Sequence, residues 1–292
     1  MDVIAEEASL PDKAFEAAWE TIKIDPAIKD RLVAQSLLAL NLRRNFTFEQ
    51  MPIHGLVVLS GEPGTGKTTL ARGLAFKVAQ ALKGQQVSFL QIDAHALASS
   101  SLGKSQQEMT KLFTQTIPER AMQAPTIVLL DEVETLAADR QRMSLEANPV
   151  DVHRATDAAL AGTDLLARNS RNTLLIATTN YPDAVDKAFL SRADLIESIG
   201  APNEHARIAI IRETLSLFAS KWSDVTQLER HVGTFAKASE GLDGRALRKA
   251  LIAAAGNSIA TAMNPGEMTK SDVLAAIDSA REAKLEKPGA GS

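Results

Sequence analysis

The sequence predicts an α/β fold in which a parallel sheet lies between helices, with a smaller all-helical domain after it. Short apolar runs alternate with helix-like stretches from about residue 56 to residue 200, as they do in parallel sheets covered by helices. Beyond Pro202, apolar residues such as Ile208 and Ile211 recur every three or four positions, which is the period of an α-helix. The first apolar run ends in a glycine-rich segment, residues 61–68, that suits a turn between a strand and a helix.

The composition is that of a globular chain of 292 residues with a hydrophobic share of 45%. Lysine and arginine together number 32 and aspartate and glutamate 36, so the formal net charge of −4 argues against nucleic acid as the main ligand. The absence of cysteine excludes disulfides and thiolate chemistry. The histidines show no metal-ligand spacing, and we interpret His54, His95 and His205 as structural or exposed.

The hydropathy pattern argues against a membrane protein. No apolar run approaches the roughly 18 residues that span a bilayer. The acidic N-terminus also lacks the apolar core of a signal peptide. We therefore expect a cytoplasmic protein without membrane contact.

Two helix-like patterns precede the sheet, at 11–21 and 26–44, and a short extended stretch from Ile22 to Asp25 separates them. The run Leu56 to Leu59 predicts a strand that leads into the glycine-rich segment, and a helix follows from Thr69 to about Lys83. Further strands are expected at 86–93, 126–130, 173–178 and 195–199.

Residues 61–68 read G-x-x-x-x-G-K-[ST], the pattern of a phosphate-binding loop. In such a loop backbone N–H groups surround phosphates at a helix N-terminus, Lys67 reaches the β- and γ-phosphates, and the Thr68 hydroxyl reaches Mg²⁺. A chance match is disfavoured because a β-branched strand precedes the pattern and a helix follows it. The candidate nucleotide-binding residues are Gly61, Pro63, Gly64, Thr65, Gly66, Lys67, Thr68 and Thr69.

An acidic pair, Asp131 and Glu132, follows the uninterrupted apolar run 126–130, which is typical of a strand buried on both faces. Ligands of parallel sheets gather at the carboxyl ends of the strands, where this pair would meet the glycine-rich loop. Asp131 would then hold Mg²⁺ with Thr68, and Glu132 would polarise the water that attacks the γ-phosphate. The alternative is an acidic N-cap that complements a helix dipole.

Three polar residues farther along the chain would complete a hydrolytic site. Asn180 ends the next strand, where an amide would orient the attacking water, although asparagine is also an ordinary turn residue. Arg192 precedes the last strand and would neutralise transition-state charge on a neighbouring subunit's nucleotide; the alternative is a surface ion pair with Asp194. Arg245 and Arg248 begin a helix of the C-terminal domain three residues apart, and Arg245, at the helix start, would sense the γ-phosphate.

The polar segment from Ala98 to Ser105 predicts an exposed loop, and so does the charged segment 139–149. Four regions follow from the pattern as a whole. They are a short N-terminal segment (1–18), a large α/β nucleotide-binding domain (19–201), a helical lid domain (202–286) and a disordered tail (287–292).

The assembled order of these features resembles the AAA+ ATPases over nearly the whole chain, which implies a P-loop AAA+ core with a helical lid. More narrowly, the chain resembles the pachytene-checkpoint remodeller family, whose members act on HORMA-domain proteins. The similar segments are Leu130–Leu136, Ala188–Asp194 with Ile199–Pro202, and Ser239–Lys249. Trp19 with Ile22 to Asp25 is similar to that family's segment around the adenine, which implies that Ile24 and Asp25 contact the nucleotide.

The resemblance implies a ring, normally a hexamer, that binds ATP and Mg²⁺ between subunits and pulls the end of a substrate through its central pore. By position, Ser101, Leu102 and Gly103 would form the first pore loop and residues 139–149 the second. The eukaryotic relatives carry an aromatic pair where this chain has Ser101-Leu102. Grip on the substrate would therefore rest on Leu102 and on backbone contacts.

The compact form of the chain, with fewer than twenty residues before Trp19, resembles bacterial members found with HORMA proteins and cyclic-oligonucleotide synthases in anti-phage signalling. Such a remodeller would release a HORMA protein from its bound peptide or partner enzyme and so restrain the defence. Two other functions share the same core. A nucleic-acid loader or initiator is disfavoured by the acidic charge and the lack of a basic stripe, and an ATP-dependent assembly scaffold by Glu132, Asn180 and Arg192.

Overall fold

Residues 3–99, 104–139 and 149–285 are described by the structure, a computed structural model. The expected first pore loop, Ser101 to Gly103, lies outside these residues, as does most of the expected second loop. The chain divides into two compact units. The sheet unit comprises 1–22, 26–62 and 67–199, and the helical unit comprises 23–25, 63–66 and the chain from Gly200 onward.

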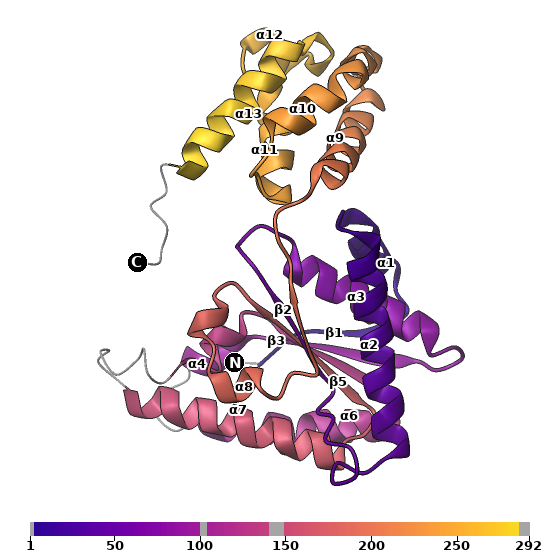
Figure 1. Ribbon diagram of the computed structural model, residues 1–292, viewed down its shortest axis with the longest axis vertical. Helices are drawn as coiled ribbons and strands as arrows, with labels where there is room; N and C mark the ends of the chain where they lie inside the picture. The colour runs from indigo at the N-terminus through magenta and orange to yellow at the C-terminus, as the bar shows by residue number, and fades with distance from the viewer. Residues whose placement is uncertain (1–2, 100–103, 140–148, 286–292) are drawn as a thin grey trace. The chain divides into compact units, whose positions relative to one another are not determined.

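A six-stranded sheet forms the centre of the sheet unit, in the order β1-β3-β4-β5-β2-β6 (Figure 1). Its strands are β1 (Ile4–Leu10), β2 (Leu56–Ser60), β3 (Val87–Ile92), β4 (Thr126–Leu130), β5 (Thr173–Thr179) and β6 (Leu195–Ser198). Every pair is parallel except β1 with β3, so the five predicted strands are confirmed and one antiparallel edge strand is added. Because β4, β5 and β2 are successive neighbours, their carboxyl ends lie at one edge.

Strand β1 is concealed in the sequence because charged residues interrupt its apolar positions. Its register places Leu10 opposite Val87 of β3, and Leu10 is fully buried. Glu6, in the middle of this strand, accepts a hydrogen bond from Arg72 Nη2 at 2.9 Å. The short N-terminal segment, residues 1–18, therefore contributes a strand to the sheet.

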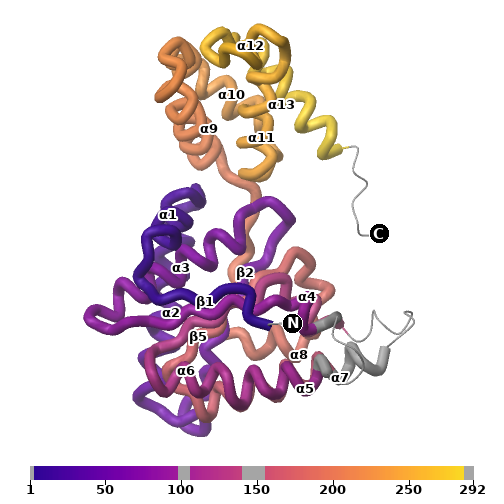
Figure 2. Tube along the Cα trace, turned by 180° about the vertical axis from the view of Figure 1, so that it is seen from behind, coloured from indigo at the N-terminus to yellow at the C-terminus, as the bar shows by residue number. Residues whose placement is uncertain are grey.

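Helices cover both faces of the sheet (Figures 1 and 2). On one face lie α1 (Lys13–Thr21), α2 (Pro26–Asn45) and α3 (Lys67–Ala81). On the other lie α5 (Lys104–Lys111), the π-helical turn η1 (Leu112–Thr116), α6 (Ile117–Gln123) and α7 (Pro149–Asn169). Phe113 and Leu160 of this second layer share a buried core with Val58 and Val128 of the sheet. Two short helices, α4 (Ala94–Ser99) and α8 (Lys187–Leu190), follow β3 and precede β6.

The helical unit confirms the change to a purely helical pattern after residue 202. Its described helices are α9 (Glu204–Ala219), the 3-10 segment η5 (Ser223–His231), α10 (Val232–Ala238), α11 (Gly244–Ala254), α12 (Ile259–Met263), the 3-10 turn η6 (Pro265–Glu267) and α13 (Lys270–Leu285). Phe235 and Leu247 are fully buried in its own core. Asp243 caps α11 by accepting from the backbone N–H of Ala246 at 2.9 Å. In the described part of the chain, no helix combines the length and the apolar character that crossing a membrane requires.

Candidate functional site

The turn between β2 and α3 has a backbone that only glycine adopts readily. Gly61, Gly64 and Gly66 have positive φ angles of 147°, 87° and 88°. At Gly61 a Cβ atom would also lie 2.2 Å from the carbonyl oxygen of Ile199. The glycines of the phosphate-loop pattern are therefore a conformational requirement of this turn.

The first residues of α3 carry the polar side chains of the loop. Lys67 is 5% exposed, and its Nζ donates to the carbonyl oxygens of Gly61 and Glu62 at 2.8 and 2.9 Å. Beside it, Thr68 Oγ1 donates to Asp131 Oδ1 at 2.8 Å. The sheet order thus brings the end of β4 to the start of α3, as the sequence pattern predicts for a phosphate loop and its acidic partner.

Asp131 receives a second hydroxyl hydrogen bond at the same oxygen, from Thr178 of β5. Thr178 is 1% exposed, and its hydroxyl also accepts from the backbone N–H of Glu132 at 3.1 Å. One buried threonine therefore holds both acidic residues. No charged motif marks Thr178; its signal is a hydroxyl near the end of a strand whose middle, Leu174 to Ala177, is apolar.

The oxygens of Thr68 and Asp131 suit a hard divalent cation. Mg²⁺ prefers oxygen ligands and keeps several waters, so it needs few protein ligands when a nucleotide supplies phosphate oxygens. In the described ranges, no three or more His, Cys, Asp or Glu side chains gather as an all-protein metal site would require. A hydroxyl and a carboxylate 2.8 Å apart fit a magnesium ion that arrives with a nucleotide.

Glu132 has a strained backbone. Among the described residues it alone combines a side chain with a positive φ angle, with φ 54° and ψ 55°. This left-handed conformation costs roughly 1–2 kcal/mol for an L-residue. The bond to Thr178 and a bond from the Thr135 N–H to the Glu132 carbonyl at 2.9 Å hold it in place. Strain of this kind concentrates at functional sites, which supports a catalytic hypothesis for Glu132.

Two neighbours hold the Glu132 carboxylate. Asn180 Nδ2 donates to Oε1 at 3.1 Å, and His95 Nε2 lies 3.0 Å from Oε2. The backbone N–H of Asn180 donates in turn to Glu134 Oε1 at 3.1 Å, so Asn180 is anchored at both ends. His95 is exposed, as the sequence suggests, but its contact with Glu132 follows from the pairing of β3 with β4 and not from any sequence spacing. The residues Lys67, Thr68, Asp131, Glu132, Thr178 and Asn180 are called the edge site below.

Arg192 pairs with Asp164 of α7 and not with Asp194, the partner considered from the sequence. Its Nε and Nη2 donate to the two oxygens of Asp164 at 2.7 and 2.8 Å. Asp194 instead accepts from three consecutive backbone N–H groups, those of His54, Gly55 and Leu56. Arg192 Nη1 donates to the carbonyl oxygen of Ala188, so these bonds join Arg192 to α7 and α8.

The helical unit carries the other candidate arginine. Arg245 is exposed in the first turn of α11, whereas Arg248 Nη2 donates to Glu213 Oε2 at 2.7 Å. The role of Arg245 as a phosphate sensor, which rests on its place at the start of the helix, stays a prediction. Ile24 and Asp25 belong to the same unit, where Ile24 is partly exposed and Asp25 exposed.

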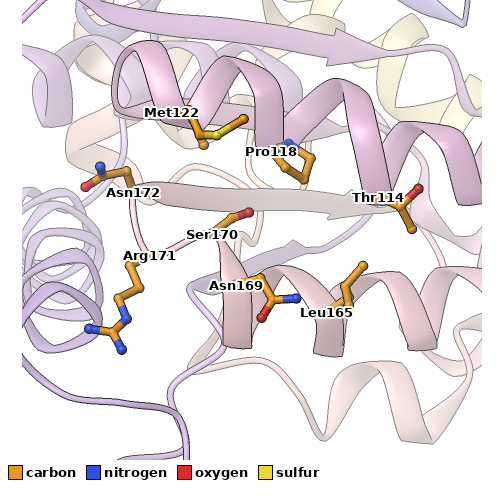
Figure 3. Close-up of a pocket in the computed structure, with 9 residues that line it drawn as sticks. Thr114, Pro118, Met122, Leu165, Asn169, Ser170, Arg171 and Asn172 are labelled. Carbon is orange, nitrogen blue, oxygen red and sulfur yellow. The ribbon is translucent and has the colours of Figure 1, made fainter.

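A cavity of about 390 Å³ lies elsewhere in the sheet unit (Figure 3). Thr114, Pro118 and Met122 line it from η1 and α6, and Asn169 and Asn172 line it where α7 ends and β5 is about to begin. The edge site gathers at the opposite, carboxyl ends of the strands. This cavity is therefore separate from the candidate site.

Comparison with known proteins places the sequence in a family. Residues 57–201 match the model of the ATPase family associated with various cellular activities (AAA). The chain is 42% identical over 279 residues to CD-NTase-associated protein 6 of Pseudomonas aeruginosa, covering 95% of this chain and 92% of that relative. It is 31% identical over 211 residues to putative pachytene checkpoint protein 2 of Caenorhabditis elegans, covering 70% of this chain and 49% of that relative. The chain thus spans about half the length of the worm protein.

Two solved structures share the fold. The structure of C. elegans PCH-2 has a TM-score of 0.74 at 23% sequence identity, covering 98% of this chain and 77% of that chain. A chain of the Escherichia coli HORMA:CdnC:Trip13 complex has a TM-score of 0.75 at 19% identity, covering 94% of both chains. These likenesses support the predicted fold class over nearly the whole sequence.

Proposed function

Because this chain belongs to the AAA family of ATPases, in the group of CD-NTase-associated protein 6 and the pachytene checkpoint proteins, we propose that it remodels a HORMA-domain protein by hydrolysing ATP. Hydrolysis would drive partial unfolding of that protein and release it from its bound peptide or partner enzyme. The observation that carries the proposal is the edge site, in which Thr68, Asp131, Glu132 and Asn180 are linked by hydrogen bonds directly or through Thr178.

ATP with Mg²⁺ is the proposed cofactor. The glycine turn would present backbone N–H groups to the phosphates at the N-terminus of α3, and Lys67 would exchange its carbonyl partners for phosphate oxygens. Thr68 and Asp131 would hold the metal, which would neutralise charge on the phosphate oxygens. Thr178 would keep Asp131 oriented while the Thr68 hydroxyl turns to the metal.

Glu132 would be the base that orients and polarises the attacking water. Its two carboxylate oxygens are held at 3.1 Å by Asn180 and at 3.0 Å by His95, so the group is fixed in direction before any nucleotide arrives. A carboxylate that is already oriented loses little rotational freedom when it forms a hydrogen bond with a water molecule. Asn180, whose amide already reaches Glu132, would contact either that water or the γ-phosphate.

The active form would be a ring, normally a hexamer, with an ATP site at each junction between subunits. Arg192 would act on the γ-phosphate of ATP held by the neighbouring subunit, and Arg245 of the helical unit would sense the same phosphate. Ile24 and Asp25 would contact the adenine end of the nucleotide. Ser101, Leu102 and Gly103 would form the loop that grips substrate in the pore.

The relatives support the choice of substrate. One similar structure is a complex that contains a HORMA protein, CdnC and Trip13, and one similar sequence is that of a protein associated with a CD-NTase. We propose that this chain acts on a HORMA-domain protein bound to a cyclic-oligonucleotide synthase in the bacterial cytoplasm. Its action would restrain an anti-phage signalling system.

Peptide release tests the remodelling activity. A HORMA-domain protein closed on a fluorescent peptide is mixed with this chain, and release is followed by fluorescence anisotropy. ATP should accelerate release, whereas ADP should not, and neither should ATP with the Glu132→Gln variant. Glu16→Gln, which makes the same exchange at an exposed glutamate of α1, is the matched control and should behave as the unsubstituted protein. An unchanged complex during measured ATP hydrolysis would reject the proposed substrate.

A further inference from the structure

The side chain of Arg192 is held on one edge by a carboxylate. Its Nε and Nη2 form a bidentate ion pair with Asp164, at 2.7 and 2.8 Å. Its Nη1 donates to the carbonyl oxygen of Ala188 at 2.6 Å. A guanidinium carries five N–H donors, so these bonds use three of them. One N–H on Nη1 and one on Nη2 are left over from these bonds. The Arg192 side chain is 21% exposed, so it is not sealed inside the unit.

Asp164 is itself held from a second side. His54 Nε2 lies 3.2 Å from Asp164 Oδ1, and the His54 side chain is 15% exposed. Burial lowers the pKa of His54, which favours a neutral ring at pH 7. A carboxylate can only accept, so Nε2 carries the proton of this bond. The His54 ring is packed edge-on against Phe48, with ring centres 5.0 Å apart.

These contacts come from three separate parts of the sheet unit: the segment before β2, helix α7 and the turn after α8. His54 fixes Asp164, and Asp164 fixes Arg192. The Arg192 guanidinium also holds the pKa of Asp164 below its ordinary value, so this carboxylate is charged at neutral pH. We call His54, Asp164 and Arg192 the arginine clamp.

We infer that Asp164 is a positioning residue for hydrolysis: it presents Arg192, already oriented, to the nucleotide of the neighbouring subunit. The inference rests on the proposed action of Arg192 across a subunit junction. A long arginine side chain loses rotational freedom when it reaches a phosphate, and a donor that is oriented beforehand avoids that loss at the moment of reaction. The pair with Asp164 uses the Nε side of the guanidinium, so the two remaining N–H groups can serve a phosphate while the clamp stays closed.

The competing explanation is a purely structural ion pair that ties α8 to α7. Asp164→Asn separates the two, because asparagine has nearly the same shape but lacks the charge and the second acceptor oxygen. We expect kcat for ATP to fall about 10- to 100-fold, as misplacement of a catalytic group does, with KM changed less than about twofold. The control Asp30→Asn, which changes an exposed carboxylate on α2, should leave both constants unchanged. A melting temperature lowered with kcat unchanged would show a structural role and overturn the inference.

Mixed rings locate the effect in one chain. Lys67→Ala and Arg192→Ala subunits are each inactive alone, but a mixture contains junctions with an intact loop on one side and an intact Arg192 on the other. Adding Asp164→Asn to the Lys67→Ala chain, which supplies Arg192, should reduce the recovered hydrolysis about 10- to 100-fold. Adding it to the Arg192→Ala chain should change nothing. Equal loss in both arrangements would overturn the inference.

A separate measurement covers the case in which the two inactive variants recover nothing when mixed. That result would reject action across a junction, which belongs to the proposed function. The coupling of Asp164 to Arg192 is then measured in uniform preparations against Arg192→Lys, which keeps the charge but loses the two-pronged geometry. If adding Asp164→Asn to the Arg192→Lys variant lowers kcat less than about threefold, Asp164 acts through Arg192. If it lowers kcat as much as it does in the unsubstituted protein, the coupling is overturned.

Discussion

The edge site and the arginine clamp lie in the same unit but use hydrogen bonds in different ways. In the edge site, the hydrogen-bonded groups are the ones that a nucleotide and its metal would bind. Lys67 Nζ donates to two carbonyl oxygens, and the Thr68 hydroxyl donates to Asp131. In the clamp, the bonds of Arg192 to Asp164 use one side of the guanidinium and would persist when the other side meets a phosphate.

The difference indicates how each region should respond to substitution. A change in the edge site removes a group that itself touches nucleotide, metal or water. A change in Asp164 or His54 leaves every such group in place and alters only the direction of Arg192. A substitution in the edge site should therefore slow hydrolysis of the ATP that the same subunit binds. A substitution in the clamp should slow hydrolysis of the ATP that the neighbouring subunit binds.

The largest expected effect is that of Arg192→Ala. Removal of an arginine that neutralises transition-state charge should lower kcat about 10³- to 10⁵-fold. Nucleotide affinity, measured by calorimetry, should change little because the loop of the same chain is intact. A fall in affinity as large as the fall in kcat would show that Arg192 contributes to ground-state binding of the nucleotide. The edge site and the clamp would then not differ in the way described above.

Glu132→Gln should follow, with kcat reduced about 10²- to 10⁴-fold through loss of general-base catalysis. Binding of ATP should persist because Lys67, Thr68 and Asp131 remain. Hydrolysis is measured by phosphate release and binding by a fluorescent nucleotide, with Glu16→Gln, an exposed glutamate of α1, as the control. Turnover at the normal rate would exclude Glu132 as the base.

Thr178→Val should destabilise the fold as well as slow the chemistry. The valine removes the hydroxyl that donates to Asp131 and accepts from the Glu132 N–H, and it leaves the strained backbone of Glu132 without that support. A typical hydrogen bond contributes about 0.5–1.5 kcal/mol to stability, a loss that urea unfolding can measure. Thr178→Ser keeps the hydroxyl and should recover most of the loss. Equal behaviour of the two variants would show that the threonine acts through packing alone.

The smallest effect concerns pH and the clamp. His54 faces Asp164 and Asp194 as well as Arg192, and burial keeps its pKa below the ordinary value of 6.5. As pH falls below about 6.5, the unfolded chain takes up a proton that folded His54 resists, so the free energy of unfolding should decrease. His54→Gln should show a shallower decrease between about pH 6.5 and pH 5 in urea titrations. An identical slope in both proteins would mean that His54 is not the group responsible.

The sequence predicts the part of this molecule that depends on local pattern. Apolar runs locate β2 to β6, and the order of motifs brings Thr68, Asp131 and Asn180 to one edge because parallel strands share a direction. The charges in β1 obscure its alternation, so pairing with β3 is visible only in three dimensions. His95 and Asp164 carry no motif of their own. Each acquires a partner far along the chain through packing of the sheet and α7, which no spacing encodes.

The most direct test of the account is ATP hydrolysis by an equal mixture of Lys67→Ala and Arg192→Ala subunits. Each variant lacks one half of the proposed junction, and about one quarter of the junctions in random mixed rings would contain both intact halves. The account predicts that the mixture hydrolyses ATP well above either variant alone, up to that share of normal activity. A mixture as inactive as its components would contradict the claim that the edge site of one subunit is completed by the arginine clamp of the next.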